Sequence, residues 1–163
     1  MATLIEFFDV PPSRDEAFLA DWERERGASG ATLYRAIRDE TPVRFVSVAP
    51  GDSHELVHED GSLDGAGVIQ ITTFAAADPE FLAAWERLHE IERGRQGYLG
   101  TRLYRGPGYV AIARWSSPLM VFRTAQLPEF LHAAAELPFS AEPALYTAVD
   151  PRSLGAGGRG SVV

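Results

Sequence analysis

The chain has 163 residues and a formal net charge of −8, with 23 acidic against 15 basic side chains. Nucleic acids and anionic membranes select clustered positive charge, so both are poor partners for this protein. The sequence contains no cysteine, which excludes disulfides, thiolate metal sites and cysteine nucleophiles. Every basic residue is arginine, which excludes Schiff-base lysines and the lysine of a phosphate-binding loop.

The N-terminal region has no charged segment followed by an apolar stretch, and no run approaches 18 consecutive apolar residues. We therefore expect a soluble, cytoplasmic protein. The Gly- and Ser-rich segment 151–163 predicts a disordered tail.

The first elements form a strand, a helix and two further strands. Thr3–Val10 predicts a strand that ends at two prolines, and Trp22 lies on the apolar face of the helix that follows. Thr32–Ile37 and Val43–Ala49 predict two strands joined by a polar turn. We assign residues 1–50 to a first, incomplete repeat and the polar segment 51–67 to a linker.

The same pattern then occurs a second time. Phe81–Arg87 repeats the FLAxWER sequence of Phe18–Arg24, and Gly100–Arg105 repeats the GxxLYR sequence of Gly30–Arg35. A repeat of this length indicates two similar lobes rather than a solenoid. The expected elements of residues 68–150 are strands at Val68–Phe74, Tyr98–Arg105, Tyr109–Trp115 and Ala144–Val149, a helix around Trp85, and helices at Ser117–Arg123 and Pro128–Glu136.

This second copy reads βαββαβ, which is a ferredoxin-like unit. The first copy lacks the second helix. The predicted fold is therefore α+β, with two tandem ferredoxin-like repeats that bury their apolar sheet faces against each other.

The sequence resembles the antibiotic biosynthesis monooxygenase family of dimeric α/β-barrel proteins. The resemblance rests on TLIEFFDVPP at 3–12, YLGTRLYR at 98–105, AIARWSSP at 111–118 and the two WER helices. It implies an enzyme of secondary metabolism that oxidises an aromatic, polyketide-type intermediate with O₂. It also implies that the substrate's own carbanion activates oxygen, so that neither a metal nor a flavin is needed.

Several side chains in the second copy are candidates for the site. His89 shares a helix face with Trp85, and a neutral imidazole there could take a proton from a phenol or enol. Trp115 has no counterpart in the first copy, which favours a functional role. We predict His89 and Trp115 as catalytic residues. The predicted substrate-binding residues are Trp85, Tyr104, Phe122 and His132.

Residues His54–His58 spell H-E-x-x-H, and Gly61 and Asp64 extend the pattern toward a zinc metalloprotease signature. That motif requires a helix, whereas Gly51 lies only three residues before His54. We interpret the segment as a solvated linker and predict no catalytic metal, and whether it binds metal stays open.

The leading hypothesis is thus a cofactor-independent monooxygenase that acts on a small aromatic molecule and can pair into a homodimer. A non-oxidative cyclase or isomerase would use the same base and pocket. A non-catalytic binding protein of the same fold is the alternative from another class, and a metalloprotease is the least favoured.

Overall fold

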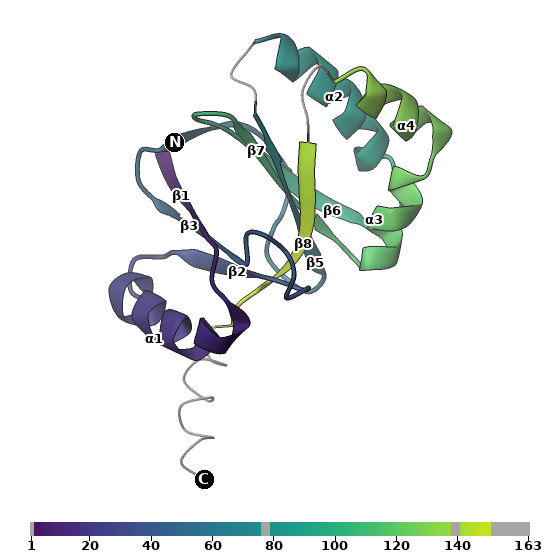
Figure 1. Ribbon diagram of the computed structural model, residues 1–163. Helices are drawn as coiled ribbons and strands as arrows, with labels where there is room; N and C mark the ends of the chain where they lie inside the picture. The colour runs from purple at the N-terminus through teal and green to yellow at the C-terminus, as the bar shows by residue number, and fades with distance from the viewer. Residues whose placement is uncertain (1, 76–78, 138–140, 151–163) are drawn as a thin grey trace. The chain divides into compact units, whose positions relative to one another are not determined.

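The computed structural model describes residues 2–75, 79–137 and 141–150 of the chain (Figure 1). These residues belong to two compact units, one built from residues up to Ser53 together with those from Tyr146 onward, and the other from residues 54–145. None of the described helices is long and apolar enough to cross a membrane. The predicted tail, 151–163, lies outside the described residues.

The first unit is a small antiparallel sheet with one α-helix. Strand β3 pairs with both β1 and β2, and Tyr146–Ala148, the end of β8, pairs with β2. Trp22 packs against Leu33 and Phe45, and its indole N–H donates to Ser47 Oγ at 3.0 Å. The elements are β1 (Ala2–Phe8), a 3₁₀ turn η1 (Pro12–Arg14), α1 (Asp15–Arg26), β2 (Thr32–Ala36) and β3 (Phe45–Pro50).

A buried ion pair anchors α1 in this unit. The Arg44 guanidinium is 2 % exposed and donates to both carboxylate oxygens of Asp15, at 2.6 and 3.1 Å. The hydrogen bonds from Arg44, with its charge and that of Arg35, outweigh burial and lower the pKa of Asp15. Because the two charged groups are sheltered from water together, removal of either would leave the other with only a more exposed partner, Asp39 for Arg44 and Arg35 for Asp15.

The second unit is a larger sheet whose strands run in the order β8-β5-β7-β6-β4. Strand β7 pairs antiparallel with β5 and β6, and β6 pairs antiparallel with β4. Three helices cover one face of this sheet (Figure 1). The elements are β4 (His54–Gly61), β5 (Val68–Phe74), α2 (Glu80–Arg93), β6 (Tyr98–Arg105), β7 (Tyr109–Trp115), α3 (Pro118–Ala125), α4 (Pro128–Ala135) and β8 (Ala141–Ala148).

Strand alternation decides which side chains face these helices. Thr101 and Leu103 of β6 point toward α2, whereas Tyr104 points to the opposite face of the sheet. In β4 a bulge between Leu56 and His58 interrupts the alternation, so Val57 and His58 both lie on the α2 side.

The fold class predicted from the sequence is confirmed: the protein is α+β, with two ferredoxin-like halves of the α/β-barrel type. The first half has a single α-helix, as expected. The structure differs from the prediction at segment 51–67, which contains strand β4 rather than only a linker. The strand forms because its backbone pairs with β6, a contact that its polar local sequence did not reveal.

Candidate functional site

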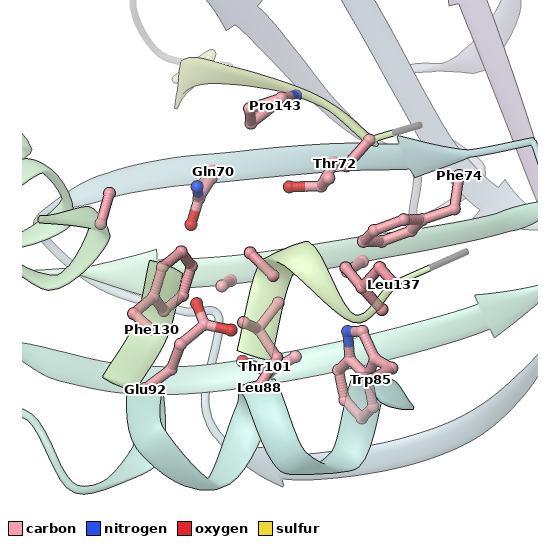
Figure 2. Close-up of a pocket in the computed structure, with 15 residues that line it drawn as sticks. Gln70, Thr72, Phe74, Trp85, Leu88, Glu92, Thr101, Phe130, Leu137 and Pro143 are labelled. Atoms are coloured by element: carbon pink, nitrogen blue, oxygen red, sulfur yellow. The ribbon is translucent and has the colours of Figure 1, made fainter. Parts of the chain in front are cut away.

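The second unit contains a largely apolar cavity of about 260 Å³ between its sheet and its helices (Figure 2). Cross-strand partners on β5 and β7 form its floor, and side chains from α2 and α4 form its walls. The apolar lining consists of Phe74, Trp85, Leu88, Phe130, Leu137, Pro143 and five alanines. The polar lining consists of Gln70, Thr72, Thr101 and Glu92.

Glu92 is the one acidic side chain among the described residues that line this cavity, and its carboxyl group points into it (Figure 2). Part of the Glu92 side chain is accessible from the cavity, whereas its carboxyl group is buried among protein atoms. This burial, together with the negative charge of Asp60, raises the pKa of Glu92 from 4.5 to about 8. The acid therefore stays mostly protonated at neutral pH, in a position to exchange a proton with a bound ligand.

A hydrogen-bonded chain leads from the cavity wall to strand β4. The Tyr98 hydroxyl bonds to Asp60 Oδ1 and lies 2.7 Å from Thr101 Oγ1. Because a phenol has one hydrogen and an ionised carboxylate is the stronger acceptor, Tyr98 donates to Asp60 and accepts from Thr101. Burial and the bond to Asp60 raise the pKa of Tyr98 far above its ordinary value.

Two histidines converge on the other oxygen of the same carboxylate. Nε2 of His58 lies 2.9 Å from Asp60 Oδ2, and Nε2 of His89 is also bonded to this atom. Burial by itself would raise the pKa of Asp60, but the bonds from Tyr98 and the two imidazoles outweigh it and lower that pKa. Burial lowers the pKa of His89, against the opposing effect of Asp60.

The helical periodicity of α2 places its site side chains on one face of the helix. Trp85, His89 and Glu92 recur at spacings of four and three residues, so they share the face that contacts the sheet. The rings of Trp85 and His89 are stacked at 4.7 Å with an interplanar angle of 7°. The His58 ring meets both of them edge-on, at 5.2 and 4.8 Å between centroids.

The structure brings only some of the predicted site residues together. Trp85 lines the cavity, and His89 lies directly behind it, bonded to Asp60. Trp115 is buried beneath α3 in a separate apolar cluster, and its indole N–H has no partner among the described residues.

The other three predicted residues lie away from the cavity. Tyr104 faces the opposite side of the sheet. Phe122 is 56 % exposed on α3, and the His132 side chain is 82 % exposed on α4, where it faces Glu136. Phe122 and His132 do not line the cavity, because other side chains of α3 and α4 face it.

Sequence reasoning missed Glu92, Thr101 and Asp60. A signal existed for Glu92, since it lies seven residues after Trp85 and therefore on the same helical stripe. No comparable signal existed for Asp60, whose partners come from α2 and from the start of β6.

The H-E-x-x-H segment forms strand β4, not the helix that a zinc protease requires. His54 is buried and belongs to no group of potential metal ligands among the described residues, whereas His58 groups with Asp60 and His89. The interpretation of the segment as a solvated linker is therefore corrected.

Comparison with solved structures identifies proteins of the same fold. A monooxygenase-like protein from Listeria innocua matches with a TM-score of 0.63 and 14% identity, over 91% of this chain and 93% of that one. A heme-degrading enzyme from Listeria monocytogenes matches at 0.60 and 14%, over 88% and 97%. An anthrone oxidase-like protein matches at 0.65 and 11%, over 91% and 90%.

No family model and no curated protein matches the sequence. At these identities the structural matches establish a shared fold. The resemblance stated from the sequence is confirmed at that level, since the fold is that of monooxygenase-like and anthrone oxidase-like proteins.

Proposed function

We propose that this protein is a cofactor-independent oxygenase that oxidises a small aromatic molecule in the cavity of the second unit, with Glu92 as its acid–base group. The observation that carries the proposal is a carboxyl group with a pKa of about 8 inside an apolar cavity. A catalytic acid or base works best when its pKa lies near the working pH, and Glu92 meets that condition.

The size and lining of the cavity support an aromatic ligand. Its volume of about 260 Å³ lies just below the roughly 300–1,000 Å³ of typical small-molecule sites, so it suits a compact substrate. Trp85, Phe74 and Phe130 offer flat apolar surfaces against which fused rings can pack. Gln70 and Thr72 can fix the substrate's carbonyl or hydroxyl groups.

The proposed reaction converts a CH₂ group beside the ring system into a carbonyl, with the balance CH₂ + O₂ → C=O + H₂O. Ionised Glu92 removes a proton, and the carbanion transfers one electron to O₂. The radical pair then combines to a peroxide anion, which takes a proton back from Glu92. Loss of water from this hydroperoxide breaks the O–O bond and forms the carbonyl, and the apolar cavity favours the carbanion because it excludes water.

His89 and Trp115 were predicted to be catalytic. In this proposal His89 acts through neighbouring groups, and Trp115, in a separate apolar cluster, takes no part. The His89 ring stacks on Trp85, and its Nε2 is hydrogen-bonded to Asp60. The negative charge of Asp60 in turn raises the pKa of Glu92. Thr101 donates to Tyr98, so the lone pairs of its hydroxyl are free to accept a hydrogen bond from the substrate.

A cyclase or isomerase is the second candidate. A carboxyl group that is protonated at neutral pH can also donate a proton to a substrate carbonyl in a reaction that does not use O₂. The test is to incubate the full chain with anthrone and hydroxynaphthalene probes while O₂ uptake and product are both recorded. An oxygenase consumes one O₂ per product and stops under nitrogen. A cyclase turns over equally under nitrogen.

The decisive variant is Glu92→Gln, which keeps the shape of the protonated acid and cannot exchange a proton. We expect its kcat to fall at least a hundredfold, in keeping with the usual contribution of a general base. Glu129→Gln, at an exposed position on α4, is the matched control. If probes raise the melting temperature but no product forms, the protein is a binder and the proposal fails.

A further inference from the structure

We propose that His58, Asp60 and His89 form a binding site for a transition-metal ion of the Zn²⁺ class, outside the cavity in which the reaction is proposed. The ligand atoms of these three side chains lie within 4.8 Å of one another. They come from β4 and α2, elements that are separate in sequence and packed together in the second unit. A bound ion would therefore link strand β4 to helix α2.

The atomic arrangement fits an ion of this size. His58 and His89 both direct Nε2 at the same carboxylate oxygen, and for His58 the separation is 2.9 Å. Ligand atoms around tetrahedral zinc lie roughly 3.3 Å apart, given metal–ligand distances of about 2.0–2.1 Å. An ion can thus replace the imidazole protons if both nitrogens move slightly away from the carboxylate oxygen and ligand atoms that are now up to 4.8 Å apart move closer together.

The donor set selects the class of metal. Two imidazole nitrogens and one carboxylate oxygen suit Zn²⁺ and its neighbours, whereas Ca²⁺ and Mg²⁺ prefer oxygen ligands alone. Tyr98 donates to the other oxygen of Asp60 and so orients this carboxylate, as outer hydrogen bonds do in metal sites. Nδ1 of His89 has no partner among the described residues, so we expect micromolar rather than nanomolar affinity.

The site also has an entry path. His58 and His89 line an open groove on the surface of the second unit, together with Glu86, Glu90 and Arg87. The two carboxylates attract a cation, and water in the groove can complete the coordination. The rest of the H-E-x-x-H motif does not take part, because His54 lies outside this group.

The test is calorimetric titration of the full chain, without a histidine tag and after chelator treatment, with Zn²⁺ and separately with Mg²⁺. We expect one equivalent of Zn²⁺ to bind with a micromolar dissociation constant, and Mg²⁺ not to bind. His58→Ala and Asp60→Asn should each weaken Zn²⁺ binding at least tenfold, and Tyr98→Phe should weaken it by about tenfold.

Two histidine variants serve as controls. His132→Ala, at an exposed position on α4, and His54→Gln, within the motif, should both bind Zn²⁺ like the wild type. Circular dichroism without metal verifies that each variant is folded, and His58 is exposed enough for its truncation to be tolerated. Substoichiometric Zn²⁺ binding, binding that survives His58→Ala, or binding lost in His54→Gln would each overturn the proposal.

Discussion

The buried carboxyl group of Glu92 should make the protein less stable as the pH rises. Its pKa is about 8 in the folded protein, against 4.5 for the ordinary side chain. Because the folded-state pKa is the higher one, its contribution to stability is complete below pH 4.5 and is lost as the pH rises through 8. Between these values each pH unit removes ~1.4 kcal/mol from the free energy of unfolding.

Glu92→Gln removes this titration and keeps the shape of the protonated acid. From pH 6 to pH 8 the full slope amounts to ~2.7 kcal/mol, and partial ionisation near pH 8 reduces it to ~2 kcal/mol. The stability of the variant relative to the wild type should therefore rise by ~2 kcal/mol over this interval. Urea unfolding at pH 6, 7 and 8, followed by circular dichroism, measures the difference.

The exposed Glu129→Gln variant should follow the wild type throughout this pH range. The reasoning is refuted if the Glu92 variant also stays parallel to the wild type between pH 6 and pH 8. That result would mean that the carboxyl group ionises near its ordinary pKa and is open to water. Glu92 would then not meet the condition for the acid–base group of the cavity, which is a pKa near the working pH.

Three further predictions concern packing and charge. Ala134→Leu should fill the cavity and weaken binding of an aromatic probe at least tenfold by fluorescence titration, whereas Ala135→Leu, exposed on the same helix, should not. Asp15→Asn should destabilise the first unit by about 3 kcal/mol because it leaves the buried Arg44 with only the exposed Asp39 as a partner, and this difference should shrink as the pH falls below about 4 and vanish only below the lowered pKa of Asp15. Gly61→Ala should lower the melting temperature, because φ is +60° and a Cβ would lie 2.3 Å from a carbonyl oxygen of β6; an unchanged melting temperature would contradict this.

Local patterns determined the fold class, because the repeat and its periodicities are properties of neighbouring residues. The FLAxWER and GxxLYR repeats predicted two related halves, and the structure confirms a ferredoxin-like arrangement in which the first half has a single α-helix. The helical spacing of Trp85 and His89 also placed both residues on the sheet side of α2. These features follow from the 3.6-residue period of a helix and the two-residue period of a strand.

Tertiary structure alone decided which polar groups meet. The segment His54–Gly61 has the sequence of a polar linker, and it becomes a strand because β6 supplies hydrogen bonds to its backbone. Its bulge then turns His58 toward α2, where Asp60 joins His89 and Tyr98. The raised pKa of Glu92 likewise depends on burial and on a charge 32 positions away in sequence, so no local pattern could predict it.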